Sequence, residues 1–438
     1  MSGLQRRQRL LTVLVLAFGV LTAAGVVALY PYGGAVDTQV PGFEIDEQRF
    51  PGVITAITEN PDAQPDFLLP GAVEILVDVR LDDGRALTIP AIDETGLFRV
   101  GQPVQVAQVS APGTEELFQI IDLPRSSPLL ALTAVFVIAV LLLGRWQGLR
   151  ALVGLALSAL IIVGFLIPAL LAGRNPTVLA AVAAMAVIFA TLPLSHGWSP
   201  TTRAAMAGTA VALLVTVGLA VVAVALTNLT GLSSEEVQMV RFSTGQAVDV
   251  RGLLLAGIIV GTLGVLDDVT VSQASTVAAL RRADPTAGDR PVFAAALRVG
   301  RDHIAATVNT LFLAYAGAAL PLLILFSVGG GPIAETLTSE LVAQEIVRTL
   351  VGSIGLILAV PLTTAVAVMV TDGTTPPVHL HAPIGSDPGA EGEMAAEAPE
   401  TAEESLAVPE APAPDDAPVA PADWEQSLRS RYGLRRDR

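Results

Sequence analysis

The sequence predicts a mostly helical membrane protein with about eight transmembrane helices, a small β-rich domain and an acidic tail. Composition is the first observation behind this prediction, because 52% of the 438 residues are hydrophobic and only 15% are charged. Soluble domains average roughly 25% charged residues. The second observation is that apolar runs near or above the roughly 18 residues of a membrane span recur along the chain. The third is that an alternating segment and a tail rich in prolines and acids interrupt these runs.

Residues 1–30 are predicted to form a cytoplasmic N-terminus and the first transmembrane helix. Arg6, Arg7 and Arg9 precede the apolar run Leu10–Leu29. A cleaved signal peptide has the same order, but its apolar part is usually about 7–15 residues long. We therefore expect a retained anchor whose arginines hold the N-terminus in the cytoplasm.

Residues 31–127 are predicted to form an extracytoplasmic β-rich domain. Apolar and polar residues alternate over Val73–Leu81, and Asp83-Gly84 is a hairpin turn signal before a return strand with Leu87 and Ile89. Shorter strand-like pieces are Val53–Thr58, Phe98–Val100, Val104–Val109 and Phe118–Ile121. About five short strands favour a small barrel, for example of the OB type. The segment contains no catalytic constellation, which favours a spacer or lid over a ligand-binding module.

Residues 128–370 are predicted to form a core of seven further spans. These spans are Leu129–Leu143, Ala151–Ala172, Thr177–Leu194, Arg203–Thr227, Gly252–Ala274, Ile304–Phe326 and Val351–Val370. An amphipathic piece, Ile333–Leu350, is expected between the last two.

The arginines of the core indicate how it is oriented. With a cytoplasmic N-terminus, eight of them fall on the cytoplasmic side, namely Arg145, Arg150, Arg203, Arg281, Arg282, Arg290, Arg298 and Arg301. Only Arg174, Arg241, Arg251 and Arg348 fall on the outer side. This asymmetry agrees with the positive-inside tendency and places both termini in the cytoplasm.

Residues 371–438 are predicted to be a disordered acidic cytoplasmic tail. From Asp372 to Arg438 the chain carries 14 acids and 5 arginines, with few apolar residues. Such a segment cannot bury a hydrophobic core. Much of the formal net charge of −16 therefore belongs to the tail.

The sixth span carries a stripe of small and polar residues on one helix face. At steps of three or four residues, this stripe comprises Gly257, Gly261, Gly264, Asp268, Ser272 and Ser275. Glycines allow close helix packing, and polar groups in lipid need partners, so we expect the stripe to face other helices or a wet cavity. Asp268 can bind a proton or cation, with the serine hydroxyls as further ligands. The alternative is that Asp268 pairs with Arg281, Arg282 or Arg301 near the cytoplasmic end.

The seventh span is expected to lie beside this stripe. Arg298, Arg301 and Asp302 form an interfacial charge cluster at its start, where an internal ion pair is the simplest interpretation. Asn309 and Thr310 lie deeper and can hydrogen-bond toward Asp268. Gly317 is assigned to helix packing, like the glycines of the stripe.

The residue inventory argues against an enzyme. The chain has no cysteine and four histidines, and it contains no phosphate-binding loop. Asp267 and Asp268 are neighbours about 100° apart on a helix, so they cannot form an aspartyl protease pair by themselves. We expect no cofactor, no metal site and no nucleic-acid partner.

Three segments of the core resemble the YibE/F family of bacterial membrane proteins. They are Gly261–Thr276, Gly300–Leu322 and Val351–Thr363, and the resemblance extends over about residues 129–370. It implies a multi-span protein of the bacterial inner membrane and favours a transporter, without indicating a solute. The first acid of the pair is often not acidic in relatives, so the resemblance favours Asp268 over Asp267.

Two functions are consistent with these features. The first is a permease or ion-coupled transporter, in which Asp267, Asp268, Ser272, Ser275, Asn309 and Thr310 line the path of an ion or solute. The second is a non-transporting scaffold or envelope sensor, in which the β domain and the acidic tail bind other envelope proteins.

Overall fold

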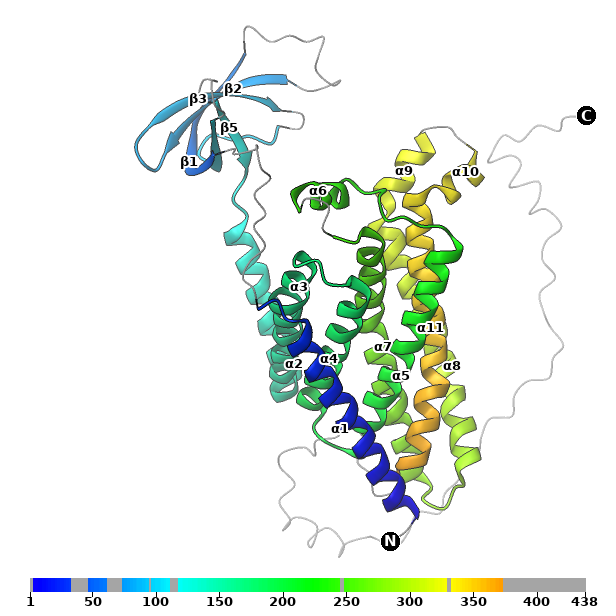
Figure 1. Ribbon diagram of the computed structural model, residues 1–438. Coiled ribbons are helices and arrows are strands. Elements are labelled where there is room, and N and C mark those ends of the chain that lie inside the picture. The colour runs from blue at the N-terminus through cyan, green and yellow to red at the C-terminus, as the bar shows by residue number, and fades with distance from the viewer. Residues whose placement is uncertain are drawn as a thin grey trace, which may run out of the picture. The chain divides into compact units, whose positions relative to one another are not determined.

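The computed structural model describes residues 3–32, 46–60, 73–93, 96–110, 117–244, 248–328 and 332–372 (Figure 1). Almost all of the predicted acidic tail lies outside these residues, and its disorder stays a prediction. Within the described residues the chain is mostly helical. Along the sequence, the strands of one small β sheet follow the first helix and precede the other helices.

The sheet has five antiparallel strands in the order β3-β2-β1-β4-β5. The strands are β1 (Asp46–Glu59), β2 (Val73–Leu81), β3 (Ala86–Asp93), β4 (Pro103–Ser110) and β5 (Leu117–Asp122). The two edge strands, β3 and β5, also contact each other, so the sheet nearly closes on itself. Closure protects edge strands from unwanted pairing.

The alternation predicted over Val73–Leu81 is confirmed. Ile75, Val77, Val79 and Leu81 are buried inside the sheet, while the residues between them face outward. The Asp83-Gly84 hairpin is also present, and Gly84 has the positive φ of 93° that such a turn favours. The expected strand at Phe98–Val100 is wrong, because this stretch is irregular and leads into the turn that precedes β4.

Twelve helices are found among the described residues. They are α1 (Gly3–Leu29), α2 (Ser126–Ile161), the π-helix η2 (Ile162–Leu166), α3 (Ile167–Leu171), α4 (Pro176–His196), α5 (Pro200–Leu226), α6 (Glu235–Ser243), α7 (Val250–Ala283), α8 (Asp289–Ala318), α9 (Leu320–Val328), α10 (Ile333–Thr338) and α11 (Glu340–Val370). Four of these helices, α4, α5, α6 and α7, have an N-cap residue whose side chain accepts a hydrogen bond from a backbone N–H of the first turn. These residues are Asn175, Ser199, Ser234 and Asp249.

Six helices of the described chain are long and apolar enough to cross a membrane. A seventh span results if α8 and α9, which are bent by 59° at their junction, are counted as one. The predicted spans 129–143 and 151–172 are joined here in one helical stretch, Ser126–Leu171. The expected amphipathic piece is also divided differently, because α11 begins at Glu340 and runs without a break into the last span.

Helix α2 is broken at Arg145. This residue has φ 49° and ψ −129°, which no α-helix allows. A Cβ added to Gly148 would lie 2.3 Å from the carbonyl oxygen of Val140, eight residues earlier. In a straight helix these residues are about 12 Å apart along the axis. The chain therefore turns back on itself at Arg145.

Helices α5, α7 and α11 form the centre of the helical part, with α8 beside α7 and α11 (Figure 1). Helix α11 is parallel to α7, because Gly352 approaches Thr262 and Thr364 bonds to Gln273 further along both helices. Helix α5 is antiparallel to both of them. Helix α4 packs against α7 and α5, and α1 packs against α4.

Glycines facing threonines bring the central helices close together. A Cβ added to Gly208 of α5 would lie 2.2 Å from the Thr363 hydroxyl of α11. A Cβ added to Gly355 of α11 would lie 2.3 Å from the Thr216 hydroxyl of α5. Both positions therefore require glycine, and the small residues allow the backbones to approach, as is typical of membrane helices.

Buried hydrogen bonds connect the same helices. The hydroxyls of Thr209 and Thr270 are 2.5 Å apart. The Gln273 amide donates to the Ala296 carbonyl over 2.9 Å and to the Thr364 hydroxyl over 2.7 Å. These bonds join α5 to α7, and α7 to α8 and α11, and they satisfy polar groups that have no water available.

Replacing Gly208 with alanine is expected to destabilise the protein. The added methyl group would clash with Thr363, whose Cα would lie 3.0 Å away, and we expect a loss of about 1–3 kcal/mol. Thermal unfolding of the purified protein in detergent measures this loss. Gly218→Ala on the same helix is the control, because nothing lies within 4 Å of its added Cβ. Equal stability of the two variants would contradict the proposed packing.

Candidate functional site

A cavity of about 340 Å³ lies between α2, α4 and α7, and we term it the aspartate cavity. Helix α7 contributes Val260, Leu263, Gly264 and Asp267 to its lining. Helix α4 contributes a mostly apolar wall with two hydroxyls, and the second half of α2 and the π-helix η2 form the opposite wall. π-Helical turns inside α-helices frequently occur at functional sites.

Asp267 is the only charged residue of the described chain that lines the aspartate cavity. Its side chain is partly buried, and its Oδ1 atom is buried without a hydrogen-bond partner among the described residues. No ion pair of the described residues includes Asp267 or Asp268. An unpaired carboxylate in apolar surroundings is costly, so the group must be hydrated, protonated or bound to a cation.

Three hydroxyls line the cavity with Asp267, and sequence reasoning missed all of them. They belong to Ser158 of α2 and to Thr191 and Ser195 of α4. Ser158 and Thr191 each donate to a carbonyl one turn earlier in their own helix, which leaves their oxygens able to accept. No motif in the sequence marks these residues, because they come from two distant helices.

Asp268 occupies a different environment from Asp267. Its side chain is exposed on the surface of α7, and no described residue forms a hydrogen bond or ion pair with it. Arg281, one of its expected partners, pairs with Asp289 instead. Successive residues of an α-helix are rotated by about 100° around the helix axis, and this rotation alone directs Asp267 to the cavity and Asp268 away from it.

The other residues predicted for the path are spread over two helices. Ser272 and Ser275 are partly buried on α7, and the Ser275 hydroxyl is buried without a partner. Asn309 and Thr310 are exposed on α8, and Thr310 donates to Ala306 of its own helix. No hydrogen bond joins Asn309 to Asp268 in the part of the chain that the structure describes.

The predicted charge cluster lies at the surface of α8. Arg298, Arg301 and Asp302 are all exposed. None of them takes part in an ion pair of the described residues, so the expected internal pair is absent there. Without a partner of opposite charge, these side chains are solvated or lie at a membrane interface.

Only one of the four glycines expected to pack against other helices does so closely. A Cβ added to Gly261 would lie 3.2 Å from the Tyr315 hydroxyl of α8, whereas one at Gly257 would lie 3.9 Å from Nη2 of Arg348, and nothing lies within 4 Å of one at Gly264 or Gly317. The expectation of close helix packing is therefore wrong at Gly257, Gly264 and Gly317. Gly257 and Gly264 instead line cavities, so the absence of a side chain provides room for water or a ligand.

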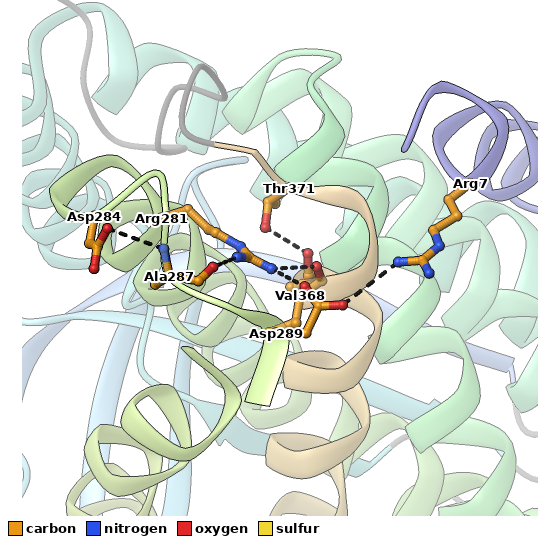
Figure 2. A network of polar contacts seen from close by, with 8 residues as sticks. Arg7, Arg281, Asp284, Ala287, Asp289, Val368 and Thr371 are labelled. Atoms are coloured by element: carbon orange, nitrogen blue, oxygen red, sulfur yellow. Dashed lines mark hydrogen bonds and ion pairs between the residues drawn. The ribbon is translucent and has the colours of Figure 1, made fainter. Parts of the chain in front are cut away.

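A polar network closes the end of the helical part where α7 and α11 end (Figure 2). The Arg281 side chain is 10% exposed and bonds to the Asp289 carboxylate and to the carbonyls of Ala287 and Val368. Asp289 also lies 3.7 Å from Arg7 of α1. Arg281 thus binds the carbonyl end of α11, where a positive charge is favourable.

The turn between α7 and α8 supports this network. Asp284 accepts a hydrogen bond from the Thr286 hydroxyl over 2.7 Å and two more from the backbone N–H groups of Thr286 and Ala287. These bonds, the Thr286 hydroxyl first, lower the pKa of Asp284. The turn is therefore held in the conformation that presents the Ala287 carbonyl to Arg281.

The described residues contain no group of three or more His, Asp or Glu side chains that could hold a metal ion. A family model described as YibE/F-like protein matches residues 132–373. No curated protein and no solved structure matches the chain.

Cysteine substitution tests whether the aspartate cavity contains water. The chain has no cysteine of its own, so each introduced thiol is the only one present. We expect Ser158→Cys and Ser195→Cys to react with a water-soluble methanethiosulfonate in proteoliposomes, because only a hydrated thiol ionises readily. Mass spectrometry of the intact protein detects the adduct.

Two positions serve as controls for this labelling. Val135→Cys on the exposed face of α2 and Ala212→Cys in the core should stay unmodified, because lipid and packed side chains exclude water. A dry cavity would leave Ser158→Cys and Ser195→Cys unmodified while Trp198→Cys in the nearby loop reacts.

Proposed function

This chain belongs to the YibE/F-like family, and we propose that it is a membrane permease in which Asp267 carries a proton or a small cation. The observation that supports this most directly is the buried, unpartnered Oδ1 atom of Asp267 at the wall of the aspartate cavity. A proton or cation bound there neutralises the carboxylate, and its release restores the charge.

Electrostatics explain why this carboxylate is suited to couple ion binding to a conformational change. In a low dielectric a charged carboxylate is stabilised only by water, a cation or a hydrogen-bond donor. A change in hydration of the cavity therefore changes proton affinity at Asp267. A permease that alternately opens such a site to the two sides of a membrane links ion binding to its conformation.

The hydroxyls of the cavity give a bound cation additional oxygen ligands. Ser158, Thr191 and Ser195 lie on two helices that face Asp267 across the cavity. Carboxylate and hydroxyl oxygens are hard ligands that suit small cations. Asp268, Asn309 and Thr310 are exposed on α7 and α8 and do not line this cavity, so they are not part of the proposed site. The solute itself stays unidentified.

The membrane arrangement we propose has eight spans and both termini in the cytoplasm of a bacterial cell. Helix α2 counts as two spans because of its break at Arg145, and α8 with α9 counts as one bent span. In this arrangement six spans separate Arg7 from Arg281, and because six is even, both residues lie at the same membrane face. The arginine asymmetry of the core favours the cytoplasmic side for this face.

A scaffold or envelope sensor is the alternative function. The β sheet carries one feature that favours it, an Arg85 guanidinium that lies 4.5 Å from the Phe50 ring centre and 5.8 Å from that of Phe118. A cation held over aromatic rings is a docking element for an acidic partner. The Nε atom of Arg85 also lies 2.7 Å from the Asp83 carboxylate, so an acidic partner would compete with this ion pair. We rank it second, because it leaves the carboxylate of the aspartate cavity without a role.

Carbodiimide labelling tests the proton site without knowledge of the solute. Dicyclohexylcarbodiimide modifies protonated carboxyl groups in apolar surroundings, so Asp267 should be labelled, increasingly as the pH falls. Peptide mass spectrometry locates the adduct. Asp267→Asn should abolish it and should also abolish proton uptake into proteoliposomes driven by a potassium diffusion potential.

Asp268→Asn is the matched control, because it removes the neighbouring acid and leaves the cavity intact. This variant should keep the label on Asp267. A label that disappears only in Asp268→Asn, or proton uptake that is unchanged in Asp267→Asn, would contradict the proposed role of Asp267 and favour the scaffold.

Single cysteines also test the arrangement of the spans. In cells, Trp198→Cys and Thr286→Cys should be shielded from an impermeant maleimide, whereas Thr230→Cys should react from outside. Labelling of all three positions after the membrane is opened provides the reference. Reaction of Trp198→Cys in intact cells would require a different number of spans or the opposite orientation.

A further inference from the structure

A second cavity, of about 570 Å³, lies at the end of the helical part where α7 begins and α8 ends. We term it the arginine cavity. Among the described residues, Glu345 and Arg348 are the only charged ones in its lining, and they lie one turn apart on α11. Apolar and small residues, about half of them from α7 and α8, form most of the remaining wall. Two charges on a span of this kind are costly unless they pair with each other or bind a ligand.

The guanidinium of Arg348 has donors to spare. Its side chain is 28% exposed, and its Nη2 atom lies 3.5 Å from the Glu345 carboxylate. Its Nε atom is buried and has no hydrogen-bond partner. An arginine side chain offers five N–H donors in a planar fork that matches phosphate and carboxylate groups. The single long contact to Glu345 leaves most of this capacity unused.

The space in front of Arg348 is open. Gly257 of α7 faces the guanidinium, and an added Cβ there would lie 3.9 Å from Nη2. Tyr315 of α8 lines the same cavity, and no described residue bonds to its hydroxyl. Gln344 is already engaged with Ser233 and Glu340, so it leaves the fork of Arg348 free.

An apolar cavity of about 330 Å³ adjoins the arginine cavity. It lies between α8, α9, α10 and α11, and apart from Tyr315, Glu345 and Thr349 its lining is apolar. The two cavities share four lining residues, namely Tyr315, Ala319, Leu322 and Glu345. A compartment with a cation and an anion therefore lies next to a compartment suited to hydrocarbon, with four residues in the wall of both.

We propose that the arginine cavity and the apolar cavity together bind one zwitterionic amphiphile. Its phosphate or carboxylate binds Arg348, its ammonium group binds Glu345, and its hydrocarbon chain fills the apolar cavity. The headgroup is zwitterionic rather than anionic because the two charges of the cavity balance. This site is separate from the aspartate cavity and does not depend on the role of Asp267.

Lipid binding to the purified, delipidated protein tests the proposal. Phosphatidylethanolamine, phosphatidylcholine and phosphatidylglycerol with identical chains are titrated separately, and native mass spectrometry counts the bound molecules. We expect phosphatidylethanolamine to bind most tightly, because its ammonium can donate hydrogen bonds to Glu345. Arg348→Gln should weaken this binding at least about tenfold, as expected for a lost bond to a charged group.

Two variants keep the test independent of misfolding. Glu345→Gln should reverse the preference toward phosphatidylglycerol, a gain of binding that an unfolded protein cannot show. Gly257→Leu should block the arginine cavity without changing any charge. Arg290→Gln is the control, because this exposed arginine lines neither cavity, and it should bind phosphatidylethanolamine like the unmodified chain. Equal binding of the three lipids, or unchanged preference in Glu345→Gln, would overturn the proposal.

The source of the amphiphile is distinguished in a second arm. Single-chain lysophosphatidylethanolamine is added to the protein in detergent, and two-chain phosphatidylethanolamine is offered in nanodiscs. If the unmodified protein binds both lipids and Arg348→Gln binds neither, the result supports binding of the phosphate headgroup by Arg348. Stronger binding of the single-chain form identifies a free amphiphile, whereas stronger binding in nanodiscs identifies a lipid of the surrounding bilayer.

Discussion

The close approach of α5 and α11, glycine against threonine, determines how the other helices can pack. Gly208 meets Thr363 near one end of this contact, and Gly355 meets Thr216 near the other. Because each threonine hydroxyl occupies the volume of a missing Cβ, the two backbones cannot slide or rotate without a clash. Helix α7 is then held against both helices by the bond between Thr209 and Thr270. The rotation of α7 follows from these contacts.

This rotation explains which polar groups lack partners. The face of α7 with Thr262, Thr270 and Gln273 is buried among the central helices, and the bonds of Thr270 and Gln273 cross to neighbouring helices. The adjacent face carries Asp267 into the aspartate cavity, where one carboxylate oxygen has no partner. Most buried polar groups in a packed core have hydrogen-bond partners, because a buried polar group without one is costly. The unpartnered oxygen of Asp267 is therefore informative.

The two ends of the helical part are held by charges of different kinds. At the end where α7 and α11 stop, Arg281 joins them through Asp289 and a carbonyl of α11. At the opposite end, the Glu340 carboxylate accepts hydrogen bonds from Thr230 and from the backbone of Gly231. Both ends are thus tied by side-chain to backbone bonds. The aspartate cavity lies between these ties, whereas the arginine cavity lies at the end that Glu340 holds, where Gly231 is part of its lining.

The sequence by itself determined the features that depend on local pattern. Apolar length predicted the membrane-spanning helices, and the alternation over Val73–Leu81 predicted the strand and its buried face, because both are properties of consecutive residues. Only the tertiary structure decided which face of α7 is packed. The glycine stripe was the natural choice from spacing, yet glycines on α5 and α11 make the close contacts instead. Whether Asp267 or Asp268 meets a cavity depends on a rotation of about 100°, and helices far away in the chain set that rotation.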